Sequence, residues 1–212
     1  MARPALGRVA RPLSAGRSRI ARLDLDRSLV GDAQADPARF DALYRKYVAQ
    51  VYSYAVYELR DPHEAEDATA RTFLSALAAL PRFREQADPA EGPEASTFRV
   101  WLFRIARTTV AERRRALRRH PQAPLEAALT VPTPGDVATE VITHDDATAA
   151  WRAIDRLDED RRRAVILRFV HEMSTAEIAA VLEKSEGAIR VLIHRGLRTV
   201  ARDLRGRGEG RA

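Results

Sequence analysis

Apolar side chains recur at intervals of three and four residues along most of this chain, which is the spacing of one face of an α-helix. The first such face runs from Phe40 to Ala55. It follows Asp36-Pro37, an N-cap residue with proline at the first helical position. A second helix is expected to begin at Asp61-Pro62-His63-Glu64, where the glutamate would complete a capping box, and to end at Pro81. We therefore predict that ordered structure begins at Asp36 with two successive helices.

A third helix is predicted to begin after Ser96, which can cap it, and to end at His120-Pro121. The segment before it, residues 82–95, is rich in Pro, Gly, Glu and Asp and is expected to be a loop. Beyond the third helix, residues 121–144 are net acidic and contain four prolines, which is typical of a linker between domains.

The fold class predicted by this pattern is all-α, because no segment shows the two-residue alternation of a β-strand. We expect two small helical domains joined by a flexible linker, the second containing a helix-turn-helix. The predicted division is a flexible basic arm at 1–31, a first domain at 32–120, a linker at 121–144, a second domain at 145–206 and a tail at 207–212.

The helix-turn-helix prediction rests on two helix starts in close succession. Ser174-Thr175-Ala176-Glu177 is a capping box, Glu183-Lys184-Ser185 a tight turn, and Ile189 begins an apolar row in the next helix. Such a second helix can enter the DNA major groove. The positions of this helix that lie opposite the apolar row or beside it are Gly187, Arg190, Val191, His194, Arg195 and Arg198. An ordinary helical hairpin with a charged solvent face has the same spacing.

Aromatic residues and arginines are interleaved in the third helix. Rings stack on the bases of single-stranded nucleic acid while guanidinium groups hold its phosphates. The aromatic residues are Phe98, Trp101 and Phe103, and the arginines are Arg99, Arg104, Arg107, Arg113, Arg114 and Arg115. The alternative is that the rings belong to the core.

The charge distribution supports two contacts with a polyanion. The 212 residues carry a net charge of only +6. However, residues 98–120 contain eight basic side chains against one acidic, and residues 161–212 contain twelve against six. Residues 121–160 between them contain two basic against nine acidic. Solvated helix faces in an arginine-rich protein would give a similar count.

Composition and motifs exclude several classes of function. The chain has no cysteine, which excludes disulfides, thiolate zinc sites and cysteine nucleophiles, and no apolar run is long enough to span a membrane. His171-Glu172 resembles the start of a zinc-protease motif, but Thr175 stands in place of the second histidine. We therefore expect no enzymatic activity, no catalytic residue, no cofactor, no metal site and a cytoplasmic location.

Two pairs of segments, residues 65–74 with 98–107 and residues 157–168 with 174–195, carry the signatures of a known family. They resemble the extracytoplasmic-function sigma factors of bacterial RNA polymerase. Residues 65–74 and 98–107 are similar to the family's region two. Residues 157–168 and 174–195 are similar to its region four. The resemblance implies a subunit that binds core RNA polymerase and promoter DNA, opens the minus-ten element with region two and reads the minus-thirty-five element with region four. It also implies that an anti-sigma protein is a possible partner.

The resemblance assigns a role to each candidate residue. Residues 82–97 are expected to receive a base extruded from the non-template strand. Polymerase binding is assigned to Glu66, Asp67, Arg71 and Phe73. Contact with the minus-ten element is assigned to Arg99, Trp101, Arg104, Arg107, Arg113, Arg114 and Arg115, with Trp101 as the most structural member. Contact with the minus-thirty-five element is assigned to Ser185, Gly187, Arg190, Val191, His194, Arg195 and Arg198.

Three positions depart from the family pattern. The family usually has Gln at Ala70, Asn at Thr108 and Asp at Glu112. The basic arm also lies outside the pattern. The main alternative function is a stand-alone helix-turn-helix regulator, which would account for residues 145–204 but leave the motifs at 61–119 without a purpose.

Overall fold

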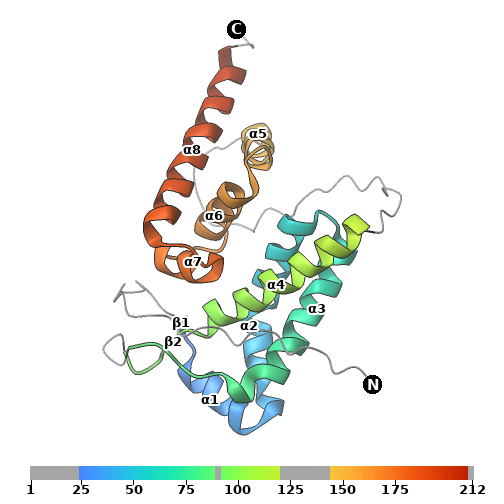
Figure 1. Cartoon of the computed structure of the whole chain (residues 1–212), viewed down its shortest axis with the longest axis vertical. Coiled ribbons are helices and arrows are strands. Elements are labelled where there is room, and N and C mark those ends of the chain that lie inside the picture. The colour runs from blue at the N-terminus through green and yellow to red at the C-terminus, as the bar shows by residue number, and fades with distance from the viewer. Residues whose placement is uncertain (1–23, 89–91, 120–143, 210–212) are drawn as a thin grey trace.

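The computed structural model describes residues 24–88, 92–119 and 144–209. Within these ranges almost all regular structure is helical, which confirms the all-α prediction (Figure 1). The helices are α1 (Arg27–Ala35), α2 (Phe40–Leu59), α3 (Pro62–Ala79), α4 (Phe98–Arg119), α5 (His144–Asp155), α6 (Glu159–Phe169), α7 (Thr175–Leu182) and α8 (Glu186–Glu209). Two 3-10 turns cover Pro37–Arg39 and Leu80–Arg82, and the strands β1 (Asp24–Leu25) and β2 (Ala95–Ser96) form a short antiparallel ribbon.

The first domain is built on α2, α3 and α4, which pack against one another along their apolar faces (Figure 1). Its core contains large side chains from all three helices. Tyr47 and Tyr54 come from α2, Phe73 from α3, and Phe98 and Phe103 from α4. The ring centroids of Tyr54 and Phe103 lie 5.7 Å apart in an edge-on arrangement, which aromatic pairs favour. Most of the periodic apolar positions of the sequence are therefore buried in the fold, with Tyr44 and Leu77 as exceptions.

Regular structure is present before the predicted start at Asp36, in β1 and α1, so residues 24–31 were wrongly assigned to the flexible arm. The carboxylate of Asp26 ties this segment to α2. Asp26 is fully buried, accepts a hydrogen bond from the Tyr47 hydroxyl and pairs with Lys46 of α2. A buried charge of this kind is stable only when it is paired and hydrogen-bonded. Residues 1–23 lie outside the described part of the chain.

The helix starts follow the predicted signals with two corrections, one at the capping box of α3 and one at the residue that precedes α4. Asp36 and Asp61 each accept a backbone hydrogen bond as N-caps, but Glu64 does not complete the capping box. Its carboxylate instead pairs with Arg113 of α4. At α4, Thr97 supplies the first helical carbonyl, and the Ser96 hydroxyl accepts the amide hydrogen of Phe98 at 3.1 Å.

The second domain consists of α5 to α8, and α8 packs along both α5 and α6 (Figure 1). Gly196 permits the approach to α6, because a Cβ atom there would lie 2.9 Å from Cγ2 of Val165. The predicted linker falls largely on residues 120–143, which lie outside the described residues. The described second domain extends from 144 to 209, slightly beyond the predicted 145–206.

The two domains are in contact, and their buried apolar residues form one cluster that extends from Val30 to Ile189. We define the interdomain interface as the contact of α2 and α4 with α5, α6, α7 and residues 170–174. The principal helix pair across it is α4 with α7. In the described part of the chain, no helix is both long and apolar enough to cross a membrane.

Candidate nucleic-acid interface

The helix-turn-helix forms as predicted. The Ser174 hydroxyl accepts the amide hydrogen of Glu177, whose carboxylate in turn accepts the amide hydrogen of Ser174 at 2.8 Å. Helix α7 then ends at Leu182, with Glu183 as its C-cap, and α8 begins at Glu186, so residues 183–185 form the turn.

The outer face of α8 is open to solvent. Ser185 caps this helix by accepting the amide hydrogen of Ala188 at 3.2 Å, while Ile189 is fully buried on the opposite side. Every predicted minus-thirty-five residue is exposed: Ser185, Gly187, Arg190, Val191, His194, Arg195 and Arg198. The sequence spacing therefore identified a single solvent-facing surface, which we call the recognition face.

The arginines of α4 are placed differently, because several of them meet carboxylates of the second domain. The Nε atom of Arg99 donates to Oε1 of Glu177 at 3.1 Å. Arg104 and Arg107 both donate to the Glu183 carboxylate, at 3.2 and 2.6 Å. These hydrogen bonds lower the pKa of the Glu183 carboxyl, so it stays ionised. The row of positive charge is thus partly neutralised from within the chain.

The remaining minus-ten candidates divide into structural and exposed residues. Trp101 packs beside Phe83 and Phe98, with centroid distances of 5.2 and 5.5 Å, which agrees with its structural assignment. Arg113 is held by Glu64 within the first domain, and this hydrogen bond raises the pKa of its guanidinium. Arg115 is exposed. The structure therefore does not bring all seven candidates to one free surface.

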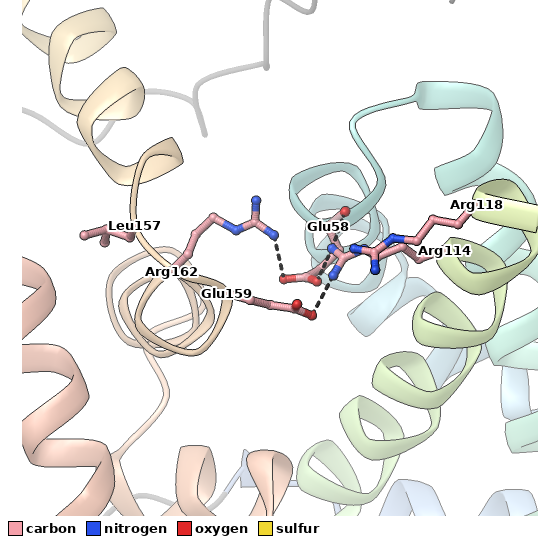
Figure 2. A pocket seen from close by; sticks show the side chains of 6 residues that line it. All are labelled: Glu58, Arg114, Arg118, Leu157, Glu159 and Arg162. Atoms are coloured by element: carbon pink, nitrogen blue, oxygen red, sulfur yellow. Dashed lines mark hydrogen bonds and ion pairs between the residues drawn. The ribbon is translucent and has the colours of Figure 1, made fainter. Parts of the chain in front are cut away.

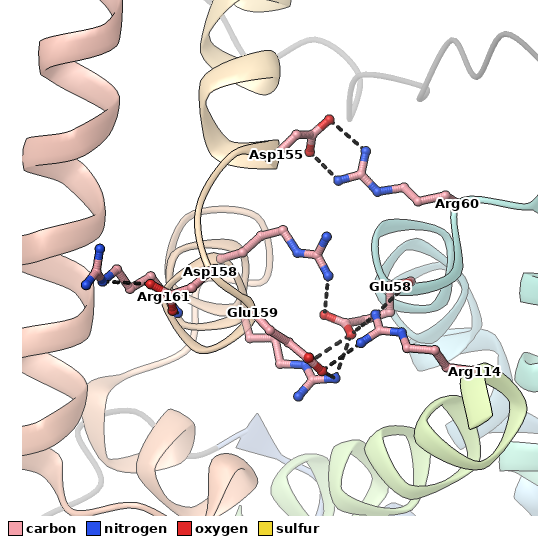
Figure 3. Close-up of polar contacts among 9 residues, drawn as sticks. Glu58, Arg60, Arg114, Asp155, Asp158, Glu159 and Arg161 are labelled. Atoms are coloured by element: carbon pink, nitrogen blue, oxygen red, sulfur yellow. Dashed lines mark hydrogen bonds and ion pairs between the residues drawn. The ribbon is translucent and has the colours of Figure 1, made fainter. Parts of the chain in front are cut away.

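The arginine Arg114 belongs to a cluster around Glu58 at the interdomain interface (Figures 2 and 3). The side chain of Glu58 is 1% exposed and accepts hydrogen bonds from Arg114 at 2.6 Å and Arg163 at 2.9 Å. Arg162 pairs with its other oxygen at 3.8 Å. Burial lowers the pKa of Arg162, and neighbouring arginines add to the effect. A pocket of about 310 Å³ opens beside this cluster, lined by Glu58, Arg114, Arg118, Leu157, Glu159 and Arg162.

In the loop expected to receive a base, the described residues 82–88 and 92–97 are organised by Glu85, which sequence reasoning did not select. Residues 89–91 of this loop lie outside the described part of the chain. The Glu85 carboxylate accepts hydrogen bonds from Ser96 Oγ at 2.6 Å and from the amide and hydroxyl of Thr97 at 2.7 and 2.8 Å. Burial alone would raise the pKa of Glu85, but the hydrogen bonds from Ser96, Thr97 and Ala87 outweigh it and lower the pKa. From the N-terminal side, Arg27 donates to the carbonyls of Ala87 and Ala95.

The predicted polymerase-binding residues lie on α3 but not all at its surface. Glu66 and Arg71 are exposed, and Asp67 is partly exposed and pairs with Arg71 at 3.0 Å. Phe73 is buried against Phe40 and Tyr44, so it supports this face and does not present itself to a partner. Sequence reasoning missed the exposed apolar residues near it, which are Tyr44, Leu74 and Leu77. Their helical spacing predicts that they belong to the buried face of each helix, and only the packing of α2 on α3 shows that they lie outside the core.

Within the described ranges, no group of three or more His, Asp or Glu side chains is arranged to hold a metal ion.

Comparison with known proteins shows the same two regions in the same order. The profile of Sigma-70 region 2 matches residues 43–120, and that of Sigma-70 region 4 matches residues 147–200. The chain is 30% identical to the ECF RNA polymerase sigma factor SigM of Mycobacterium tuberculosis over 176 residues, covering 83% of this chain and 82% of SigM. It is 34% identical to the ECF RNA polymerase sigma factor BldN of Streptomyces coelicolor over 184 residues. That match covers 85% of this chain but 64% of BldN, less than two thirds of that relative's length.

A solved structure of CnrH in complex with the cytosolic domain of CnrY has a similar fold, with a TM-score of 0.58 and 25% identity. The similarity covers 86% of this chain and 99% of CnrH. The sigma factor RpoE of Bartonella quintana, in complex with the anti-sigma factor NepR, shares the fold with a TM-score of 0.58 at 19% identity, over 78% of this chain and 96% of RpoE. The family profiles, the relatives and the architecture agree, and the chain belongs to the extracytoplasmic-function sigma factors of bacterial RNA polymerase.

Proposed function

We propose that this chain binds core RNA polymerase and directs it to a specific class of promoters, as a dissociable subunit that catalyses no reaction itself. The observation that carries the proposal is the presence of a region 2 domain and a region 4 domain in one chain, the latter with a fully exposed recognition face. A stand-alone regulator needs only the second of these domains. The proposed site of action is the bacterial cytoplasm, where the polymerase and the promoter are found.

The recognition face is proposed to read the minus-thirty-five element. Arg190 lies in the first turns of α8, where a helix inserted into the major groove meets base edges, and arginine pairs bidentately with guanine. The exposed Val191 offers an apolar contact of the kind that suits a thymine methyl group. Arg195 and Arg198 follow on the same exposed face and are suited to phosphates.

The loop at 82–97 and the start of α4 are proposed to open the minus-ten element. Extruding a base costs a few kcal/mol, which nearby arginines and hydrogen-bonded loop ends can offset. Glu85 and Arg27 hold the described ends of this loop, and Arg99 and Arg104 follow directly on α4.

The exposed face of α3 is proposed to bind polymerase. It combines the polar Glu66, Asp67 and Arg71 with two exposed leucines, Leu74 and Leu77. Leu74 is 67% exposed. A polar rim around exposed apolar side chains is typical of a protein–protein contact. An anti-sigma protein is a second proposed partner, because solved relatives of similar fold are bound to CnrY and NepR.

The proposal is tested by reconstitution. Purified full-length chain is mixed with core polymerase, and co-elution is followed by retention of promoter fragments from the source genome. We expect a stable complex that retains a subset of promoters only when the chain is present. A chain that binds duplex DNA tightly alone and does not associate with core polymerase would instead be a stand-alone regulator.

A further inference from the structure

Carboxylates of the helix-turn-helix occupy the arginines of α4. Glu177, which is 2% exposed in its side chain, pairs with Arg99, and Glu183 bridges Arg104 and Arg107. Both glutamates belong to α7 or its C-cap. Three of the arginines assigned to the minus-ten element are thus already paired with carboxylates of the second domain.

A second set of contacts closes the other end of the interdomain interface (Figure 3). Arg60 at the end of α2 holds both carboxylate oxygens of Asp155 at the end of α5. Arg114 donates to Glu159 of α6 at 2.7 Å as well as to Glu58. The ion pairs therefore extend along α4 and across to α2, and do not form one local contact.

Apolar packing lies between these ion pairs. His171 is 5% exposed, with its ring 5.3 Å from that of Phe103 and 6.2 Å from that of Tyr54. Trp151 of α5 stacks on Tyr57 of α2 with a centroid distance of 5.0 Å and an interplanar angle of 18°. Aromatic side chains and arginines are both enriched at specific interfaces.

Residues with an unusual backbone conformation also lie at this interface. In the described part of the chain, three residues other than glycine have left-handed φ angles: Arg60 at 63°, Glu172 at 51° and Glu183 at 57°. Glycine is the usual residue at such helix C-termini. Arg60 and Glu183 instead carry side chains that pair across the interdomain interface, and Glu172 directly follows His171. Strained non-glycine conformations of this kind cluster at functional sites.

We propose that the interdomain interface is a self-inhibitory contact, in which the acidic side of α7 acts as an intramolecular competitor of minus-ten DNA for the arginines of α4. This inference rests on the proposed function, since it takes Arg99, Arg104 and Arg107 as DNA ligands. The two DNA-binding surfaces are then unequal in the free chain. The recognition face is open, while the surface that opens the promoter is masked until the domains separate.

A reversible covalent lock tests this directly, because the chain has no cysteine of its own. Arg60→Cys/Asp155→Cys is treated with a bismaleimide whose spacer contains a disulfide, and the linked chain is compared with the same chain after reduction. The readout is fluorescence anisotropy of a single-stranded, minus-ten-like oligonucleotide at low salt. We expect the linked chain to bind at least tenfold more weakly than the reduced chain. Equal affinity, including no binding by either, overturns the inference.

An opened variant supplies the converse test. Glu177→Gln/Glu183→Gln/Asp155→Asn removes three carboxylates from the interdomain interface, and glutamine can still act in the capping box of α7. The matched control is Asp32→Asn/Asp41→Asn/Asp160→Asn, which changes the net charge equally but removes pairs within single domains. The opened variant should bind the oligonucleotide at least tenfold more tightly than the control, with thermal melting confirming that both fold.

Equal binding by the opened and control variants contradicts the self-inhibitory contact. Failure of the proposed function is recognised separately, because it requires that even the reduced or opened chain does not associate with core polymerase.

Discussion

The Nε atom of Arg99 donates to Oε1 of Glu177 across 3.1 Å, although 78 positions separate the two residues in the sequence. The other oxygen of the same carboxylate accepts the amide hydrogen of Ser174 and completes the capping box of α7. One side chain thus starts the first helix of the helix-turn-helix and joins the second domain to an arginine of the first.

These two roles can be separated by substitution. Glu177→Gln keeps an acceptor for the capping box and removes the charge, whereas Glu177→Ala removes both. We expect Glu177→Ala to lower the free energy of unfolding by roughly 1–3 kcal/mol, because the Arg99 guanidinium loses its pair with this carboxylate and the cap is lost. Glu177→Gln should lose distinctly less. Urea denaturation measures both, and Glu186→Gln, at a partly exposed i,i+4 pair with Arg190, is the control. Identical losses for Gln and Ala would show that the cap contributes nothing.

The contact between α6 and α8 predicts a sharp effect at Gly196. Gly196→Ala places a methyl group 2.9 Å from Cγ2 of buried Val165, so the helices must move apart. We expect the second domain to lose about 1–3 kcal/mol of stability, as for other overpacked sites. Gly187→Ala is the control, since the nearest atom there lies 4.0 Å away, and alanine favours a helix. Thermal denaturation should separate the two variants clearly. Equal melting temperatures would mean that the close helix contact does not exist in solution.

His171 predicts a dependence of stability on pH. Burial, with a smaller contribution from the nearby Arg99, lowers its pKa to about 4. An unfolded histidine takes up a proton near its ordinary pKa of 6.5, whereas the folded chain resists protonation down to about 4. The stability associated with this side chain is therefore fully present above pH 6.5 and is lost progressively as the pH falls from 6.5 to 4.

His171→Phe should flatten that dependence, because Nε2 of His171 has no hydrogen-bond partner and a phenyl ring can pack against Tyr54 and Phe103. Melting temperatures recorded between pH 7 and pH 5 measure the effect. His63→Phe, at an exposed position, should leave the profile of the natural chain unchanged. An unaltered slope in His171→Phe would place the titration elsewhere.

Arg190 is expected to affect promoter choice but not polymerase binding. Arg190→Ala removes an exposed side chain whose pair with Glu186 is one of the weak surface type, so stability should change little. Loss of a bidentate base contact should weaken retention of cognate promoters by about 1–3 kcal/mol, or roughly 5- to 150-fold. Competition binding by the reconstituted polymerase measures this, and Arg205→Ala further along α8 is the control. Equal loss of core binding would contradict the assigned role.

Leu74 is expected to affect polymerase binding but not the fold. Its residue is 67% exposed, so Leu74→Ser should leave the melting temperature nearly unchanged. If α3 meets the polymerase, the same change should weaken association with core enzyme by about tenfold, the usual effect of losing a central apolar contact. Leu25→Ser, at an equally exposed position on β1, is the control. Titration of labelled chain with core polymerase would decide the matter, and unaltered affinity would move the contact away from this face.

Local signals in the sequence were sufficient for α2, α3, α4 and the helix-turn-helix with its recognition face, but not for α1. The capping box at Ser174 and the turn at residues 183–185 depend only on neighbouring residues, so they could be predicted. The burial of Asp26 could not, because its partners Lys46 and Tyr47 are brought to it by tertiary packing. The role of Glu85 was missed for a similar reason, since its partners lie eleven and twelve positions away across a loop.

The arginines of α4 show a different limit. Their number and spacing predicted a basic face, which is correct for the helix in isolation. Their neutralisation by Glu177 and Glu183 depends on how two domains meet, and helical periodicity carries no information about that arrangement.

Promoter-directed transcription by reconstituted polymerase is the most direct test of the central claim. Core polymerase is incubated with a genomic promoter library in the presence or absence of the full-length chain, and the 5′ ends of the transcripts are sequenced. We predict that the chain produces a defined set of start sites sharing upstream elements near positions minus ten and minus thirty-five, and that these starts are absent with core enzyme alone. A separate reaction with another sigma factor first shows that the core enzyme is active. If that enzyme then gives an identical set of transcripts with and without the chain, the account is contradicted.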